Sequence, residues 1–509
     1  MERFLAQATK LVLTNKILVI TLMVTFFVRL PSLFEPLWYG DEAIYLTIGQ
    51  KLARGGLMYV DIFDHKTPGI YYLAAVTLKV LGESIWSFRF LLMIWVLVSL
   101  VVFYLLAKKM FNKKAALWAV ILLSVLTSTP LIEGNSVNSE ILMILPITLG
   151  ILVGLNKKFF LSGIFFSLAF LLKFPGVFDF AAFFVFAALA INKNTIVPTL
   201  KNLLGLTAGF LLPIILTIVY FTAKGALGTY VYSAFFFNIA YTSYHNHFII
   251  ENGLLIVKAA PLVTLLIYFL VRLYSRLKEQ KESGFGLYEF LIIWLVFSFY
   301  GATFGGRPYE HYIIQAVPAF SLVGVASFYR KSLAKIGAAA ITVIVILTLL
   351  LGFQPFITPS YYPNFFRYLS GKFTFEQYTA GFNWHAATNY ALATFLKGCE
   401  KFNQGGNCER WRTSKEDKLY VFSNQPGIYF LSGLDPASRY ITFFHIAGDE
   451  KAKKETFTEV RQSKPKYILV ETPHLGPFPD LEKLLSSRYN LFAFYEDTAI
   501  YQIIPSATN

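Results

Sequence analysis

Charged residues are scarce in this chain. Asp, Glu, Lys and Arg make up 15% of its 509 residues, whereas about a quarter of an ordinary soluble protein is charged. Cysteine is rare too, since only Cys399 and Cys408 are present, which is too few for a disulfide framework or a cysteine metal site. Hydrophobic residues reach 56% and aromatic residues 17%. A disordered chain, a fibrous protein and a single soluble globular enzyme are therefore excluded.

Long apolar runs account for this composition. About 20 apolar residues span a bilayer as a helix, and the sequence holds about eleven runs that reach or approach this length. The runs are residues 17–34, 90–106, 115–131, 141–155, 159–172, 177–191, 203–221, 254–271, 290–304, 312–328 and 336–353. No small-residue cleavage site follows the first run, so it is a membrane helix and not a cleavable signal peptide. The sequence predicts an α-helical polytopic membrane protein.

Lysine and arginine predict the orientation, because basic loops stay in the cytoplasm. With the N-terminus inside, the cytoplasmic edges of the helices hold 18 Lys and Arg against four acids. The net charge of +15 is therefore a topology signal, and nucleic acid is excluded as a partner. Residues 69–82 would be a twelfth span only if most of these lysines were exported, so we expect a helix on the outer membrane surface. The predicted location is the cell membrane.

The sequence changes character after residue 353. Residues 1–353 form the predicted membrane domain, with a first outer loop at 35–89, whereas residues 354–509 mix polar and apolar segments. Strand-like segments at 418–423 and 466–471, and helix-like segments at 389–397 and 481–487, predict a small α/β domain. The topology places this domain outside the membrane. An oxidising setting there permits a disulfide between Cys399 and Cys408, with free thiols as the alternative.

Polar residues on the predicted outer face are the candidates for a functional site. Charges near hydrocarbon are costly and usually face an interior cavity. Lysine and arginine can hold a phosphate, and a carboxylate can take a proton from an attacking hydroxyl, so a reaction at a lipid head group suits this mixture. The candidates are Asp41, Glu42, Asp61, Asp64, His65, Lys66, Arg89, Glu140, Lys173, Arg307 and His311.

Several candidates also have a structural interpretation. Glu42 would stabilise the start of the helix that begins there, because a carboxylate is favoured at the positive end of the helix dipole. Lys66 and Lys173 would be interfacial anchors whose ammonium groups reach the head-group region. His245 and His247 have a spacing that can bind metal, but no third ligand is close in the sequence. For these residues a structural role remains an alternative to a functional one.

Four segments resemble those of a known family. They are Asp41-Glu42 with Tyr45, Asp64-His65-Lys66-Thr67-Pro68, Lys173-Phe174-Pro175 and His311-Tyr312. They are similar to segments of the C-type (GT-C) integral-membrane glycosyltransferases, in the branch of the dolichyl-phosphate-mannose protein mannosyltransferases and the bacterial aminoarabinose transferases. The resemblance extends from about Arg29 to Phe353 and is strongest in the first outer loop. Thr67 stands where many relatives have proline.

The resemblance implies a hexosyl- or pentosyltransferase that takes a sugar from a polyprenyl-phosphate donor at the outer face, with inversion. Asp41 would be the general base or would bind a divalent metal cation, with Glu42 beside it as a second catalytic carboxylate. The donor phosphate would be bound by Lys66, His65, Arg307, His311 and Lys173. The sugar and the acceptor, whether lipid, polysaccharide or protein, stay open.

The main alternative is a transporter or flippase of a lipid-linked sugar, because charged residues inside a helical bundle also mark transport paths. Against it, the predicted helices show no pseudo-symmetric halves, and the polar residues collect on one side of the membrane. The C-terminal region also lacks the sugar-binding repeats of the eukaryotic protein mannosyltransferases. The sequence therefore favours a bacterial-type transferase.

Overall fold

The computed structural model describes residues 15–191, 194–238, 286–329, 359–398, 413–471 and 478–505, with isolated positions between 263 and 349. The chain divides into two compact units. The helical unit comprises residues 1–32, 90–227 and 235–357, and the α/β unit comprises residues 33–89, 228–234 and 358–509. Residues 33–89, which include the whole predicted first outer loop at 35–89, thus group with the C-terminal residues.

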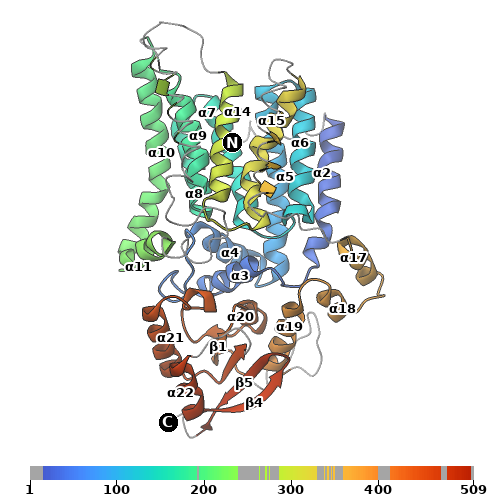
Figure 1. The fold of residues 1–509 in the computed structure, drawn as a ribbon, viewed down its shortest axis with the longest axis vertical. Helices are drawn as coiled ribbons and strands as arrows, with labels where there is room; N and C mark the ends of the chain where they lie inside the picture. The colour runs from blue at the N-terminus through green and yellow to red at the C-terminus, as the bar shows by residue number, and fades with distance from the viewer. Residues whose placement is uncertain are drawn as a thin grey trace. The chain divides into compact units, whose positions relative to one another are not determined.

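The helical unit is built from apolar helices that lie side by side (Figure 1). Its elements are α2 (Lys16–Arg29), α5 (Ile85–Met110), α6 (Lys113–Ser128), η2 (Pro130–Ile132), α7 (Ser139–Leu155), α8 (Phe159–Leu172), α9 (Gly176–Ala188), α10 (Ile196–Ala223), α14 (Leu287–Thr303), η5 (Glu310–Ala316) and α15 (Val317–Tyr329). Short segments η1 (Leu30–Leu33), α11 (Leu227–Val231) and the π-helical turn η3 (Tyr232–Phe236) lie at the divisions between the units along the chain.

Four helical stretches of the described residues are long and apolar enough to cross a membrane, at residues 16–33, 85–110, 196–223 and 310–329. Helices α7, α8, α9 and α14 are apolar but have only 13 to 17 residues. Every predicted run that falls within the described residues forms a helix. The runs at 254–271 and 336–353 lie almost wholly outside them, so the count of eleven stays a prediction. The chain is a multi-pass membrane protein.

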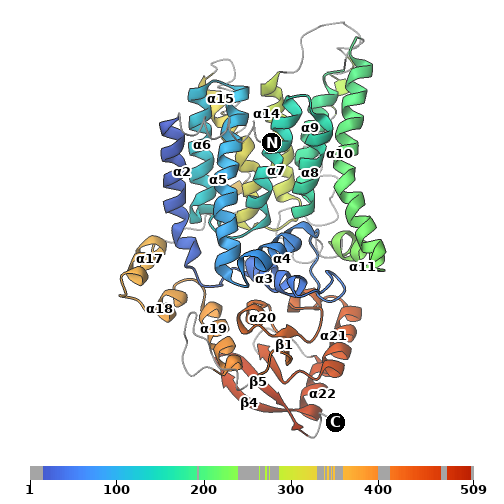
Figure 2. The same cartoon turned by 180° about the vertical axis from the view of Figure 1, so that it is seen from behind.

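Two glycines allow helices α8 and α10 to approach closely. Helix α8 packs against α7 and α10, α9 against α14, and α6 against α2 and α15; Figure 2 shows α7, α8 and α10 from behind. A Cβ on Gly163 would lie 2.1 Å from the carbonyl oxygen of Leu206, and one on Gly209 would lie 1.9 Å from that of Phe160. Only glycine permits this approach of the α8 and α10 backbones, as is common between membrane helices.

The α/β unit contains a five-stranded sheet. Its strands are β1 (Lys418–Phe422), β2 (Asp435–Pro436), β3 (Tyr467–Glu471), β4 (Tyr489–Tyr495) and β5 (Thr498–Ile503). Its helices are α3 (Gly40–Ala53), α4 (Gly69–Leu81), α17 (Tyr361–Leu369), α18 (Phe375–Ala380), α19 (Trp384–Lys397), α20 (Gly427–Ser432), η6 (Phe443–His445), α21 (Glu450–Ser463) and α22 (Pro479–Arg488). The predicted small α/β arrangement is present, although the sequence analysis missed β4, β5 and α21.

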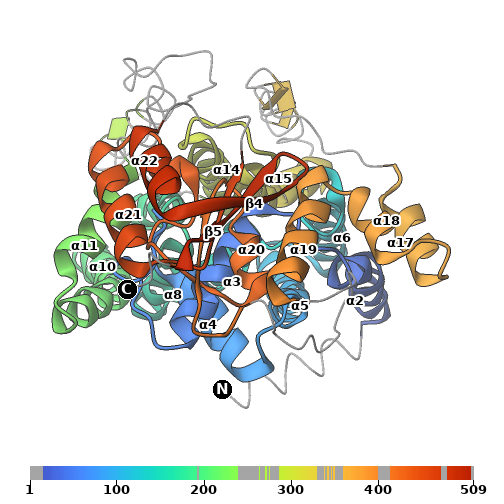
Figure 3. The same cartoon turned by 90° about the horizontal axis from the view of Figure 1, so that it is seen from below.

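The sheet has the strand order β2-β1-β3-β5-β4. Strand β1 pairs with β2 and β3 in parallel, and β5 pairs with β3 and β4 antiparallel. Figure 3 shows α21 and α22 on one side of the strands and α19 on the other. Phe395 of α19 packs on Tyr467 of β3, and Phe457 of α21 packs on Phe422 of β1. The aromatic residues of the C-terminal region thus build its core.

Segments far apart in the sequence pair within this unit. The amide of Phe63 donates to the carbonyl of Arg439 over 2.8 Å, and Phe63 forms a parallel bridge with Tyr440. Helix α3 packs on α4, where a Cβ on Gly49 would lie 2.7 Å from that of Ala74. Helix α4 is about 20 Å long, shorter than the roughly 30 Å hydrocarbon core. Its predicted position on the membrane surface stays a prediction.

Candidate functional site

Asp41 and Lys66 form the centre of the candidate site. Asp41 lies in the first turn of α3, where the helix dipole favours a carboxylate. The Nζ of Lys66, from the loop between α3 and α4, lies 3.1 Å from Asp41 Oδ1 and 3.7 Å from Asp64 Oδ2. Tyr45, one turn along α3, donates its hydroxyl to Asp41 Oδ2 over 3.0 Å, and its ring lies 5.0 Å below the ammonium. Two residues predicted for proton transfer and phosphate binding are therefore in direct contact.

Asp64 is buried beside this pair and contacts three other side chains. Its Oδ1 lies 2.8 Å from His65 Nδ1 and 3.0 Å from His445 Nε2, and its Oδ2 accepts from the Tyr71 hydroxyl. His445 follows the segment that pairs with Phe63, and its Nδ1 lies 2.7 Å from the Thr442 hydroxyl. The sequence analysis missed His445 and Tyr71. No local pattern marks His445, which is 381 positions from Asp64.

Burial and charge set the protonation states of this cluster. Burial raises the pKa of Asp64, but the charges of Lys66 and His65 and the hydrogen bond from His445 outweigh it and hold that pKa well below its usual range. Burial lowers the pKa of His65, and it lowers the pKa of His445 to about 4. At neutral pH Asp64 is therefore ionised and both imidazoles are neutral.

These three side chains fit a divalent metal ion. The ligand atoms of Asp64, His65 and His445 lie within 4.8 Å of one another, and all three residues are buried. A carboxylate with two neutral imidazoles is a donor set that zinc accepts, and the Thr442 hydroxyl would orient the His445 ring. Asp41, the residue predicted to bind a metal, is not part of this group. The candidate metal site in the structure is therefore the cluster of Asp64, His65 and His445, which lies beside Asp41.

Glu42 and Arg89 form a separate, buried ion pair. Arg89 donates two hydrogen bonds of 2.7 Å to the two carboxylate oxygens of Glu42, and their side chains are 4% and 2% exposed. Arg89 also donates to the carbonyl oxygens of Glu35 and Pro36. Both oxygens of Glu42 thus face a guanidinium and not an open site. This geometry favours a positioning role for the pair, which anchors the start of α3 and so places Asp41.

A second polar cluster lies within the helical unit. Lys173 donates to Glu140 Oε1, and its ammonium lies 3.9 Å from the centre of the Tyr312 ring. His311 Nδ1 lies 2.7 Å from Glu133 Oε2. These contacts bring together the predicted candidates Glu140, Lys173 and His311, and add Glu133. The candidates thus fall into two groups, one in each unit.

Two candidates remain, Asp61 and Arg307. Asp61 is exposed and accepts from the Leu57 amide over 2.7 Å, so it closes a local turn. Arg307 is 8% exposed. Asp179, which the sequence analysis did not single out, accepts from Trp294 and Gln315 over 2.7 Å each. The histidines and cysteines singled out in the sequence lie outside the described residues: His245, His247, Cys399 and Cys408.

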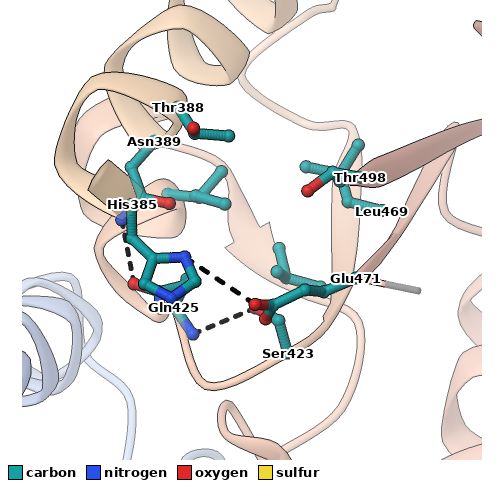
Figure 4. Close-up of a pocket in the computed structure, with 10 residues that line it drawn as sticks. His385, Thr388, Asn389, Ser423, Gln425, Leu469, Glu471 and Thr498 are labelled. Atoms are coloured by element: carbon teal, nitrogen blue, oxygen red, sulfur yellow. Dashed lines mark hydrogen bonds and ion pairs between the residues drawn. The ribbon is translucent and has the colours of Figure 1, made fainter. Parts of the chain in front are cut away.

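A small polar pocket lies at the carboxyl ends of β1 and β3 (Figure 4). His385 Nδ1 lies 3.7 Å from Glu471 Oε1 there, and Asn389 donates to Gln425 over 3.0 Å. Parallel α/β sheets often bind ligands at such a point, where the strand order changes direction. The pocket has space for about one water molecule. It is therefore too small to admit a sugar ring.

Comparisons with known proteins agree with the family resemblance drawn from the sequence. Residues 65–221 match the family model described as dolichyl-phosphate-mannose-protein mannosyltransferase. No curated protein matches the chain. The chain is similar to the crystal structure of ArnT from Cupriavidus metallidurans bound to undecaprenyl phosphate, with a TM-score of 0.56 and 14% identity over 96% of this chain and 98% of that one. The fold is that of a C-type glycosyltransferase.

The apo structure of the same ArnT gives a TM-score of 0.58 with the same identity and coverage. An oligosaccharyltransferase from Archaeoglobus fulgidus, crystallised with zinc and sulfate, is less similar, with a TM-score of 0.45 and 14% identity over 90% of this chain and 68% of that one. The family resemblance drawn from the sequence is confirmed. The segment that matches the family model contains Lys66, Glu140 and Lys173, whereas Asp41 precedes it.

Proposed function

We propose that this C-type protein transfers a sugar from a polyprenyl-phosphate-linked donor to an acceptor on the outer face of the cell membrane, with inversion at the anomeric carbon. The observation that carries the proposal is the Asp41–Lys66 contact of 3.1 Å in a chain with the fold of ArnT. That ArnT structure holds undecaprenyl phosphate, and the matching family model is described by a dolichyl-phosphate donor. The lysine distribution supports a cytoplasmic N-terminus and an outer C-terminal region.

Lys66 is suited to bind the donor phosphate. Its ammonium has three N–H groups, and Asp41 and Asp64 both lie within ion-pair distance of it. Its side chain is 9% exposed, and an ammonium with little water around it interacts more strongly with a phosphate. The same cation would stabilise the charge that develops on the phosphate as it leaves the sugar.

Asp41 is suited to accept the proton of the acceptor hydroxyl. Its side chain is 23% exposed, so it is the accessible carboxylate of the cluster, whereas Asp64 is fully buried. Tyr45 holds one oxygen of Asp41, which fixes the orientation of the carboxylate. A divalent ion on Asp64, His65 and His445 would supply a Lewis acid for phosphate oxygens.

The short Asp41–Lys66 distance implies a movement on donor binding. In inverting glycosidases the two reacting carboxyl groups lie about 6.5–9.5 Å apart, because the attacking group and the sugar lie between them. A separation of 3.1 Å has no room for a sugar. We therefore expect the donor phosphate to draw Lys66 away from Asp41. Loss of the neighbouring cation makes a carboxylate a stronger base, so donor binding would itself prepare Asp41 to accept a proton.

The experiment uses the purified full chain in proteoliposomes with a panel of radiolabelled polyprenyl-phosphate sugars. Asp41→Asn should lower the transfer rate by about 10²- to 10⁴-fold while the amount of folded protein stays the same. Lys66→Gln should weaken apparent donor affinity by about 10- to 100-fold, the value of a charge-assisted hydrogen bond. Asp61→Asn, an exposed carboxylate of the same loop, is the matched control and should transfer normally.

Two results would overturn the proposal. One is full transfer by a normally folded Asp41→Asn protein. The other is movement of the labelled lipid across the bilayer with no sugar transfer by the parent protein, which would favour the flippase alternative.

A further inference from the structure

Helix α17 presents an apolar surface to its surroundings. Tyr361 and Phe365 are buried on one side of the helix, at 6% and 2% exposed. Phe366 and Leu369 are 60% and 61% exposed, and their spacing of three residues makes them neighbours on the helix surface. Two large apolar side chains side by side in water are unfavourable in proportion to their exposed area. The surface of α17 is therefore suited to an apolar partner.

An open groove runs along the same surface. Phe366 and Leu369 line it together with Pro363, Arg367, Ser370 and Lys372, and its volume is about 510 Å³. The Arg367 guanidinium lies over the Phe373 ring at 5.4 Å and donates to Asn364 over 3.5 Å. Within the part of the chain that the structure describes, neither Arg367 nor Lys372 pairs with a carboxylate. The groove thus combines two available cations with apolar walls.

We propose that this groove binds an anionic phospholipid of the bilayer, with its phosphate on Arg367 and Lys372 and the start of an acyl chain on Phe366 and Leu369. An amphiphile with a negative head matches both halves of the lining. A soluble anion would leave the apolar pair exposed, and an apolar peptide would leave the cations unpaired. Each Lys or Arg near an anionic membrane surface contributes about a fivefold preference for that surface.

The position of α17 in the chain supports a lipid partner. Helix α17 begins at Tyr361, eight residues after the end of the last predicted membrane run at residue 353. An extended chain spans at most about 3.5 Å per residue, so this connection reaches no more than about 28 Å. The start of α17 therefore stays within reach of the bilayer surface. Short amphipathic helices with aromatic and basic residues commonly lie at that surface.

The test places a reporter in the groove of the full chain. Leu369→Trp is reconstituted in bilayers that contain brominated phosphatidylglycerol or brominated phosphatidylcholine, and quenching is measured as the difference from the parent protein, whose seven tryptophans are the background. We expect stronger quenching by the anionic lipid. Adding Arg367→Gln or Lys372→Gln should lower that preference by about fivefold for each cation removed. Glu376→Trp, an exposed position of α18 outside the groove, is the matched control and should show no preference.

Three results would overturn the proposal. The first is a Leu369→Trp reporter that neither lipid quenches. The second is equal quenching by the two lipids that does not change when the cations are removed. The third is release of quenching by undecaprenyl phosphate at concentrations where unbrominated phosphatidylglycerol has no effect, which would assign the groove to the polyprenyl lipid. Transfer by Leu369→Trp should match the parent, so this outcome is independent of the proposed reaction.

Discussion

The buried pair of Glu42 and Arg89 predicts that Glu42→Met destabilises the protein when Arg89 is present and stabilises it when Arg89 has been replaced. Arg89→Met leaves the Glu42 carboxylate buried without its cation, which costs about 3–5 kcal/mol. It also removes the donors to the carbonyls of Glu35 and Pro36, at about 1–3 kcal/mol each. Glu42→Met in the parent protein leaves Arg89 buried without its counterion and should also cost about 3–5 kcal/mol.

In the Arg89→Met background the same Glu42→Met change should stabilise the protein. Both proteins then lack the two bonds to the carbonyls, so their difference isolates the buried charge. We expect a gain of about 3–5 kcal/mol relative to Arg89→Met alone. The free energies of unfolding are compared in mixed micelles titrated with SDS, using intrinsic fluorescence.

The double variant also separates a positioning role of Glu42 from a catalytic one. Both oxygens of Glu42 are held by Arg89, so we expect the double variant to retain transfer at a level that follows its stability. A stable double variant with no transfer would make Glu42 a catalytic residue. Failure of Glu42→Met to stabilise Arg89→Met would refute the reasoning about the buried charge.

Three further predictions follow from single contacts. Burial raises the pKa of Glu35 above 4.5 despite the nearby Arg89 cation, so the folded state binds the proton more tightly and the stability that Glu35 contributes falls as the pH rises. The melting temperature of Glu35→Gln relative to that of the parent should therefore rise from pH 4.5 to pH 8. A difference that stays constant over this range would contradict this prediction. Gly209→Ala should cost about 1–3 kcal/mol by pushing α8 from α10, whereas Gly205→Ala, whose Cβ meets nothing within 3.8 Å, should unfold like the parent; equal melting temperatures would count against the close contact. His445→Gln should lower the zinc retained by the purified protein, measured by elemental analysis, and a parent protein that retains no zinc would remove the metal candidate.

The sequence predicted the membrane helices well because each one is specified locally. A long apolar run has one stable solution in a bilayer, a helix that satisfies its own hydrogen bonds, and α5 and α10 form where the runs at 90–106 and 203–221 predict them. The strands β1 and β3 are short buried apolar runs and were found in the same way. Strand β4 was missed because residues 491–495 are all apolar or aromatic and so lack the apolar–polar alternation that marks a half-buried strand.

The candidate site was only half accessible to sequence reasoning. Asp41 and Lys66 stand in recognisable segments of one loop, and the structure brings them into contact. His445 was out of reach, since its role depends on the bridge between Phe63 and Tyr440, a pairing that no local pattern encodes. For the same reason the motif at residues 41 and 42 could not separate the accessible carboxylate from Glu42, whose partner Arg89 lies 47 positions away.

The contact between Asp64 and His445 has a consequence for biosynthesis. His445 follows Asp64 by 381 positions, so the first loop leaves the membrane insertion machinery long before its partner has been synthesised. Closing so long a loop is slow and comes late in folding. The chain therefore carries its charged loop in an unfinished form until the C-terminal region has been made and folded. A copy truncated or cleaved before residue 445 would keep its helices in the membrane but would lack His445, and with it the completed cluster of Asp64, His65 and His445.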